Sequence, residues 1–312
     1  MSTQSTSNFV TSGSLGELIR REAIPVFESN LFFAKLGKQA NLPTGFNKYT
    51  FPTVDESAAA VTLTEGVTPT EGQATITNVE VTLSQFGKHV ILSDVLLSDA
   101  PVEVVIVASV EMARVTAEKF DADIQDVLDA GTNVTYVGQT SRAAITATDV
   151  ITSTAVAKEV NLLRAADAPK YDGNYYVTVM HPHVFHDLQQ ESGTGTFIDL
   201  RKYDSPEELF TGEAGSQWGT RILLSSNVQF YADAGATSTV DVYPTYFLGK
   251  DAYGVVMSGG LQTIAKALGS GGTEDPLNQR MTVGAKIRGK AAILKQAAIR
   301  RLESASSLGA NT

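Results

Sequence analysis

Three histidines within six residues are the first candidates for chemistry in this chain. His181, His183 and His186 occur in the segment HPHVFH, and Asp187 follows directly. On a helix, His183 and His186 would share one face at a spacing of three residues, and two imidazoles on one face can bind zinc. No second cluster of carboxylates and histidines accompanies them, and Pro182 already explains the segment as the first turn of a helix. We therefore predict no metal site, and keep a metal-dependent enzyme that uses these three histidines only as a second alternative.

Other motifs that carry chemistry are also missing from the sequence. It has no GxSxG elbow, no GxxxxGK[ST] phosphate loop and no GxGxxG after a strand. The fragments nearest to such motifs, at Gly193 and Gly249, are better explained as turns, and GSGG at 269–272 as a linker. The chain contains no cysteine, which excludes disulfides and thiolate metal ligands. We expect no catalytic residue, no cofactor and no metal, and we predict that the protein is not an enzyme.

Charge is distributed unevenly along the chain. The 312 residues carry a formal net charge of −10, which argues against general nucleic-acid binding by the whole chain. Residues 276–312 nevertheless contain seven basic side chains and one acid, so that this end carries +6 and the remainder −16. Two explanations stay open: two surfaces with different neighbours, or basic strands that neutralise acids within 121–129 of the same fold. No apolar run is long enough to predict a transmembrane helix.

The segment 101–130 must organise the surrounding elements. Apolar side chains recur in it at steps of three and four, which predicts one amphipathic helix of about 45 Å. The apolar stripe comprises Ile106, Val110, Ala113, Ala117, Phe120, Ile124 and Val127. We expect this stripe to pack on the strand at 281–287, where apolar and basic residues alternate. The acids Asp121, Asp123, Asp126 and Asp129 are spread around the helix, and we expect them to form a solvated face.

An extended region precedes this helix. Residues 48–54 (KYTFPTV) predict one strand, and 75–97 alternate apolar and polar side chains as a half-exposed strand does. The Gly- and Pro-rich stretch EGVTPTEGQ between them predicts the tip of a β-hairpin. A limb of about twenty residues would reach roughly 65 Å, longer than the usual strand of a globular domain. We favour a hairpin that projects onto a partner over one that breaks into shorter strands.

The other elements flank the hairpin and the long helix. A helix is predicted from Ser14, interrupted at Pro25, and the phenylalanines that follow need a partner surface on this chain or on another copy. Helices and strands alternate from about 135 to 265, including a short helix at 205–212, which indicates a compact α/β unit. Residues 291–302 fit a strand or a helix equally well.

Six short motifs, in this order, resemble the major capsid protein of tailed bacteriophages, which has the Hong Kong 97-type fold. Two resemble the E-loop and hinge of the branch found in N4-like podophages: TLTEGVTPTEGQ at 62–73 and VTLSQFGKHVILSD at 81–94. Three resemble the axial domain: NYYVTVMHP at 174–182, LFTGEAGSQWGTRILLSSN at 209–227 and FLGKDAYGVV at 247–256. The last, DPLNQRMTVGAKIRGKAAILKQAAIRRLES at 275–304, resembles the closing strands of the peripheral domain.

The resemblance implies an α+β capsid fold with a defined order of parts. These are an N-terminal arm (1–45), an E-loop hairpin (46–97), the spine helix of the peripheral domain (98–134), an axial domain (135–268) and closing peripheral strands (269–312). It implies hexamers and pentamers that form an icosahedral head around packaged double-stranded DNA, held without sequence readout. The E-loop of each copy would lie over a neighbour, with Glu65, Gly66 and Pro69 near its tip acting through contacts.

The resemblance also implies partners and a location. We expect a virion protein that is assembled in the host cytoplasm, has no contact with a membrane, and meets a portal and decoration proteins. The family's long N-terminal scaffolding domain has no counterpart in the dozen or so residues before Leu15, so we expect a separate scaffolding protein. The first alternative is an encapsulin-like compartment shell, which shares the fold but encloses enzymes. No motif for the Lys–Asn cross-link of some relatives is evident.

Overall fold

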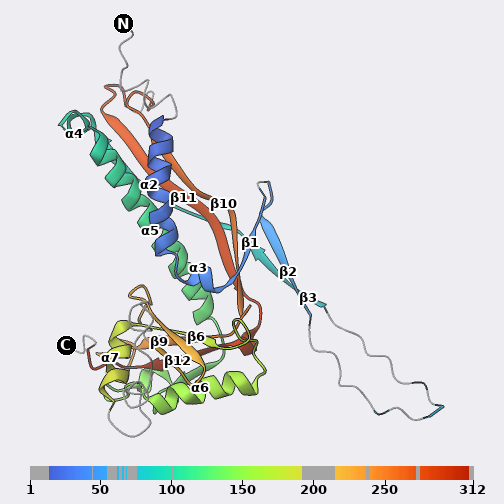
Figure 1. Ribbon diagram of the computed structural model, residues 1–312. Coiled ribbons are helices and arrows are strands. Elements are labelled where there is room, and N and C mark those ends of the chain that lie inside the picture. Colours follow the sequence, from blue (N-terminus) through green and yellow to red (C-terminus); the bar gives the residue numbers. More distant parts are fainter. Residues whose placement is uncertain are drawn as a thin grey trace.

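Most of the chain is described by the structure, a computed structural model. The described residues are 14–43, 45–54, 62, 65–66, 68, 76–99, 101–191, 215–236, 239–271 and 275–308. They form three parts, named here for their shapes: an elongated shaft of helices and strands, a base built on a second sheet, and a two-stranded arm that leaves the shaft sideways (Figure 1). The predicted helix at 205–212 and most of the predicted hairpin tip lie outside the described residues.

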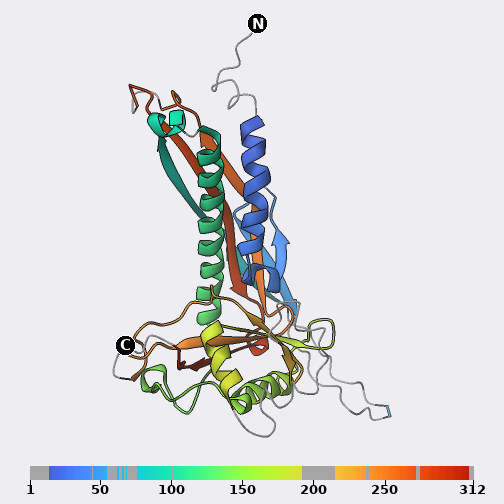
Figure 2. The same cartoon turned by 60° about the vertical axis from the view of Figure 1, so that its left-hand side comes forward.

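Two long helices run along the shaft. Helix α5 (Pro101–Asp129) follows the short α4 (Asp94–Asp99), and α2 (Ser14–Asn30) lies beside it before the chain turns into α3 (Phe33–Leu36). Figure 2 shows α2 and α5 side by side over much of the shaft. The periodicity of the sequence therefore predicted the long helix correctly, with both ends within a residue or two.

The shaft sheet lies against these helices. Its strands are ordered β1–β10–β11–β4, with bounds Lys38–Asn41, Tyr253–Lys266, Arg280–Ile293 and Ser84–Ser93. Strand β11 is antiparallel to both β10 and β4. The short β1 is parallel to β10 and pairs only with its first part, from Gly254 to Met257. The sheet thus joins four segments that are far apart in the sequence, and α5 covers its central strand.

The predicted contact between the long helix and the strand at 281–287 is confirmed. Val105 of α5 shares a buried cluster with Met281 and Val283. Further down, a Cβ on Gly289 of β11 would lie 2.6 Å from the ring of Phe120, so only glycine lets this ring lie against the strand. The absence of a side chain at Gly289 therefore lets α5 approach β11 closely at Phe120.

The buried stripe of α5 differs from the predicted one at its two ends. Its buried apolar members are Val105, Met112, Ala113, Ala117, Phe120, Ile124 and Leu128. The predicted members Ile106, Val110 and Val127 are only half-buried. The difference arises because α5 contacts both the sheet and α2, so its apolar surface is wider than a single stripe and includes neighbouring positions.

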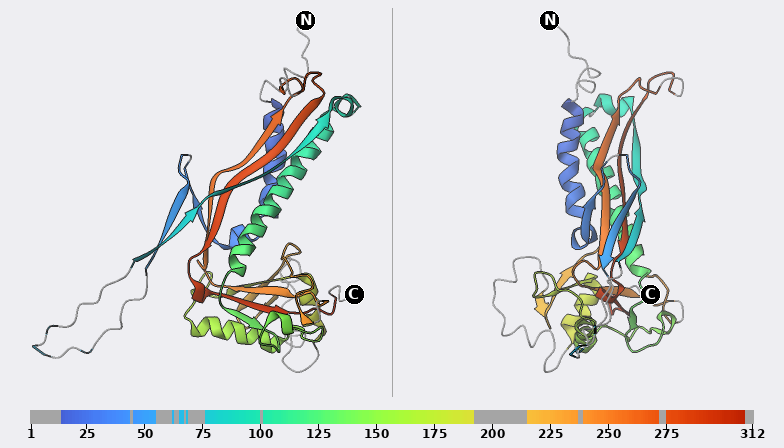
Figure 3. Two further views of the ribbon diagram at one scale, coloured as in Figure 1. Left: turned by 180° about the vertical axis from the view of Figure 1, so that it is seen from behind. Right: turned by 90° about the vertical axis from the view of Figure 1, so that its right-hand side faces the viewer.

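The arm consists of β2 (Lys48–Val54) and β3 (Ile76–Thr82), which pair with each other in a separate two-stranded sheet. The prediction of one continuous limb over 75–97 is wrong, because the chain breaks at Leu83 and continues as β4 in the shaft sheet. A single long limb would leave β4 unpaired, whereas β11 offers it a full ladder of hydrogen bonds. The hairpin is therefore shorter than predicted, and it still projects from the shaft (Figure 3).

The base is built on a six-stranded sheet. Its strands, in spatial order, are β5 (Val134–Tyr136), β12 (Ile299–Ser304), β9 (Tyr243–Leu248), β6 (Tyr176–Met180), β8 (Thr220–Leu224) and β7 (Gly215–Gln217). Helices α6 (Ser153–Ala165) and α7 (Pro182–Gln190) pack on it. The expected α/β unit is present, but the chain returns from β11 to supply β12, which settles the ambiguous segment 291–302 as the end of β11, a 3₁₀ turn at Gln296–Ala298 and a strand.

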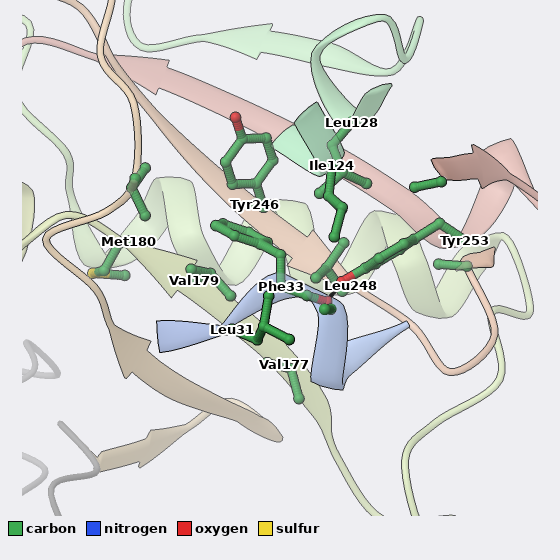
Figure 4. Close-up of a cluster of buried hydrophobic side chains, with 14 of the residues drawn as sticks. Leu31, Phe33, Ile124, Leu128, Val177, Val179, Met180, Tyr246, Leu248 and Tyr253 are labelled. Atoms are coloured by element: carbon green, nitrogen blue, oxygen red, sulfur yellow. Dashed lines mark hydrogen bonds between the residues drawn. The ribbon is translucent and has the colours of Figure 1, made fainter. Parts of the chain in front are cut away.

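One hydrophobic core runs from the shaft into the base. Phe33 is fully buried between them, and its ring meets that of Tyr246 edge-on at 5.6 Å between centroids. Figure 4 shows Phe33 among Ile124 and Leu128 of α5 and strand residues of the base. The Tyr253 hydroxyl also donates a hydrogen bond of 2.6 Å to the Phe33 carbonyl. The phenylalanines after α2 thus find their partner surface within this chain.

Helix α2 does not stop at Pro25, contrary to the prediction. The helix continues to Asn30, whose side-chain amide donates to the carbonyl of Val26 at 2.7 Å. Proline removes one backbone hydrogen bond from a helix interior and usually breaks it. Burial of Ala23 and Phe27, on either side of Pro25, favours the helical path over a break. In the part of the chain that the structure describes, no helix is long and apolar enough to cross a membrane.

Candidate interaction surfaces

The histidine segment is a structural feature of the base. His181 precedes α7, and its Nδ1 accepts a hydrogen bond of 3.2 Å from the backbone N–H of His183. The Nδ1 atom of His183 lies 3.2 Å from the hydroxyl of Tyr243. Asp187 accepts from the backbone N–H of Ser307 at 3.1 Å. His181, His183 and Asp187 are thus engaged in hydrogen bonds within the base, and His186 is half-buried on α7.

The protonation of His181 agrees with this role. Burial, followed by the nearby His183, lowers the pKa of His181 to about 4. The ring is therefore neutral at pH 7 and can accept the hydrogen bond that begins the helix. Among the residues described by the structure, no group of three or more His, Asp or Glu side chains could hold a metal ion.

The acids of α5 do not form the solvated face that was predicted. Asp121 is fully buried and accepts hydrogen bonds from the backbone N–H groups of Phe33 (2.9 Å) and Ala34 (3.2 Å). Asp123 pairs with Lys290 at 2.8 Å. Of the four acids, Asp126 is exposed. The prediction fails because the segment after α2 and the strand β11 approach this side of the helix, which periodicity cannot reveal.

Asp129 links α5 to the base. Its carboxylate accepts hydrogen bonds from the Tyr246 hydroxyl at 2.7 Å and from Arg301 at 3.2 Å. In the same region Glu303 is fully buried between Arg142, at 2.7 Å, and Arg301, at 2.9 Å. The hydrogen bonds that Arg142 donates to Glu303, together with the negative charge of Glu303, hold the pKa of the Arg142 guanidinium above its ordinary value.

The basic C-terminal segment is therefore partly neutralised within the fold. Lys290, Arg300 and Arg301 all form ion pairs with acids of this chain, Arg300 with the buried Glu159 at 2.6 Å. This confirms the second of the two explanations for the charge segregation for Lys290 and Arg301, whose partners lie within 121–129, whereas Arg300 pairs with an acid of α6. Among the described residues, no ion pair is formed by Arg280, Lys286, Arg288 or Lys295.

The face of the shaft sheet that points away from α5 is covered only in part among the described residues. Its lower half is covered by the arm, where Phe51 packs on Gly254 and shares a buried cluster with Val256. Its upper half presents Lys286, and a hollow of about 390 Å³ lies there between β4, β10 and β11. The sequence indicated the alternation within β11 but not that β4 and β10 flank it.

A second exposed surface lies at the far end of the shaft. Its apolar side chains are Val95 (66% exposed), Leu96 (41%), Val107 (67%), Leu268 (39%) and Leu277 (74%). They come from α4, the start of α5 and the connection between β10 and β11, which a backbone hydrogen bond of 3.0 Å from Asp94 to Gln279 holds together. Several large apolar groups exposed together are typical of surfaces that contact other molecules.

This combination of a long spine helix, a separate α/β base and a projecting hairpin defines a viral capsid subunit of the Hong Kong 97-type fold. The structure is similar to the capsid of Ralstonia phage GP4, with a TM-score of 0.68 and 15% identity over 87% of each chain. It is also similar to the capsid of cyanophage P-SCSP1u (TM-score 0.66, 17% identity, 89% of each chain). A virus-like particle from Pyrococcus furiosus matches with a TM-score of 0.54 and 10% identity, over 92% of this chain and 98% of the other.

The sequence agrees with the structural likeness. The family of proteins described as phage capsid protein matches residues 76–301, which is more than half of the chain. The chain therefore belongs to the phage capsid protein family. None of the curated proteins matches it. Assignment to the N4-like branch stays a prediction.

Proposed function

We propose that this chain is a major capsid protein that assembles into hexamers and pentamers, and that these form an icosahedral head around packaged double-stranded DNA. The observation that carries the proposal is the likeness to phage capsids over 87–89% of this chain. A two-stranded hairpin is at best marginally stable alone in water. Phe51 and Val81 anchor the arm β2–β3 to the shaft of the same chain, and we infer that a neighbouring copy covers the rest of the arm.

The parts of the fold have distinct roles in this proposal. The shaft serves as the peripheral domain with α5 as its spine, the base serves as the axial domain at the capsomer centre, and the arm serves as the E-loop. Strands β4 and β10 belong to the shaft sheet, so the peripheral domain draws on segments outside 98–134 and 269–312. In a closed shell, each modest contact is repeated by symmetry, which suits reversible assembly.

Partners and location follow from the same proposal. The protein is a virion component that assembles in the host cytoplasm, together with a scaffolding protein, a portal and decoration proteins. DNA inside the head would be contacted through its phosphates, without sequence readout and with a strong dependence on salt. The protein acts through contacts rather than catalysis.

Electron microscopy of negatively stained particles tests the proposal. The purified chain, alone and mixed with lysate of the infected host, is expected to form closed shells of uniform size with fivefold and sixfold capsomers. Monodisperse monomers under every condition would contradict it. Shells purified from the native source should contain double-stranded DNA, and shells filled with an enzyme would instead favour the encapsulin-like alternative.

Metal analysis tests the enzyme alternative separately. The purified chain is compared with a variant in which His181, His183 and His186 are replaced by alanine. We expect no stoichiometric zinc in either protein. Zinc that is present in the wild type and lost in the variant would contradict this expectation.

A further inference from the structure

Strand β10 has a free outer edge over its second half. Strand β1 pairs with β10 only from Gly254 to Met257, and the backbone N–H of Leu42 then donates to the Met257 carbonyl at 2.8 Å. Residues 262–266 pair with β11 in an unbroken register, and no segment among the described residues pairs with their other side. Free N–H and C=O groups at a sheet edge can pair with a strand of another chain. The first half of this edge already accepts a strand, so the second half is open to another.

A β-bulge opens a groove between this edge and helix α2. Three residues of β10, from Gly259 to Leu261, face the single Ile287 of β11, because the register shifts there. The groove has a volume of about 630 Å³ and is lined by α2 and β10 only. A Cβ on Gly260 would find no atom within 4 Å, so the glycine leaves this space open. The bulge lies outside 262–266, which stay regular along the free edge.

One row of α2 side chains lines the groove. Arg20, Ile24 and Glu28 all line it, and their spacing of four residues places them on one line along the helix. Phe27 and Leu31 of the same helix also line it, and they are nearly buried, at 4% and 5% exposed. Arg20 and Glu28 are exposed, and neither forms an ion pair within the described part of the chain. Helix α2 thus presents a cation, an apolar group and an anion in that order.

This row matches the spacing of side chains on a strand. Four residues advance a helix by about 6 Å, and two residues advance a strand by about 6.6 Å. Helix α2 is antiparallel to β10, because Ile19 packs near Ala265 whereas Leu31 shares a cluster with Val255. An added strand that is antiparallel to β10 therefore runs in the direction of α2. It would meet the row with an acid, an apolar residue and a base at alternate positions.

This chain has no other segment with that pattern. Of its 24 Lys and Arg residues, Arg21 alone has an acid four residues before it, at Glu17. Both of these residues lie in α2 itself. A second copy therefore cannot supply the complementary row, and the partner is a different protein.

We infer that the groove between α2 and 262–266 is the docking site for an extended segment of a different protein, which adds an antiparallel strand to β10. The segment carries an acid against Arg20, an apolar side chain against Ile24 and a base against Glu28. In this mode of recognition, main-chain hydrogen bonds supply affinity and the alternate side chains supply specificity. The inference goes beyond the proposed function, because it concerns a single subunit and needs no neighbouring copy.

Two peptides of equal composition test the inference. In VTDTVTKTV the acid, the central valine and the lysine share one face of a strand, whereas in VTTDVKTTV the two charges lie on the opposite face. Fluorescence anisotropy of the labelled peptides measures binding to the unassembled full-length chain. The first peptide should bind at least about tenfold more tightly than the second. Equal Kd values, or a Kd above about 1 mM for the first peptide, would overturn the inference.

A charge-swapped variant identifies the row on α2. Arg20→Glu, Glu28→Arg exchanges two exposed charges, and this variant should prefer VTKTVTDTV over VTDTVTKTV by at least about tenfold. The matched control is Arg21→Glu, Glu22→Arg, which exchanges an exposed ion pair of the same helix outside the groove and should bind as the wild type does. A swapped variant that keeps the wild-type preference would show that the peptide binds elsewhere. Circular dichroism confirms that each variant folds.

Hydrogen exchange distinguishes strand addition from contact through side chains alone. Binding of VTDTVTKTV should slow exchange of the outward-facing amides within 262–266 at least about tenfold, because these amides become hydrogen-bonded. Mass spectrometry of proteolytic fragments measures this protection. Binding that leaves exchange in 262–266 unchanged would also overturn the inference. None of these measurements requires shells, so their failure would not affect the proposed function.

Discussion

Asp121 gives the sharpest prediction about stability. Its carboxylate is fully buried where α5 meets α3, and its Oδ1 atom accepts two backbone hydrogen bonds while its Oδ2 atom has no hydrogen-bond partner. Burial raises the pKa of Asp121 to about 6, although the hydrogen bonds from the segment around Phe33 oppose the rise. The ionised carboxylate is therefore less stable in the folded chain than in the unfolded one.

The sign and size of the effect follow from linkage. A pKa that is higher in the folded state than the ordinary value of 3.8 means that the folded state binds the proton more tightly. Above pH 6 the ionised group lowers the free energy of unfolding by about 2–3 kcal/mol, since one pKa unit corresponds to about 1.4 kcal/mol. This loss is relieved as the pH falls from 6 to 4, and it is absent at lower pH.

The variant Asp121→Asn isolates this effect. The amide oxygen can still accept the two backbone hydrogen bonds, and no charge is buried at any pH. Urea unfolding of the unassembled subunit between pH 4 and 8 should show the variant and the wild type equal near pH 4. The variant should become more stable by up to about 2–3 kcal/mol at pH 8.

The control and the refutation use the same measurement. Asp126→Asn removes an exposed carboxylate from the same helix and is the matched control. If Asp121→Asn lowers the free energy of unfolding at pH 8 by more than it does at pH 4, the buried carboxylate stabilises the fold and the reasoning is wrong.

Three further predictions concern contacts of α5 and of the base, each measured as the free energy of unfolding in urea. Gly289→Ala places a Cβ 2.6 Å from the Phe120 ring and should cost about 1–3 kcal/mol, and Phe120→Leu in the same chain should recover part of that loss; purely additive losses would contradict this. Glu303→Ala leaves Arg142 without its ion-pair partner, while Arg301 keeps Asp129, and should cost about 3–5 kcal/mol, so a loss below about 1 kcal/mol would show that Arg142 finds another partner. Asp123→Lys places a second cation opposite Lys290. It should lower the free energy of unfolding by at least about 1 kcal/mol, and by more than Asp123→Asn does; equal losses in the two variants would show that position 123 is solvated.

Local patterns in the sequence determined the elements and their order. The steps of three and four in 101–130 predicted α5 closely, because a helix is made of contacts between near neighbours and one periodicity describes it. The same holds for strands β2 and β11. The order of short motifs was enough to indicate the capsid family before any contact was known.

Tertiary structure alone decided which distant segments meet. The pairing of β4 and β10 with β11 depends on hydrogen bonds between residues that are up to about two hundred positions apart, which periodicity does not encode. The burial of Asp121, the continuation of α2 through Pro25 and the pairing of Arg301 with Asp129 have the same origin. In each case a neighbour from elsewhere in the chain changed the environment of a residue whose local pattern pointed to solvent or to a break.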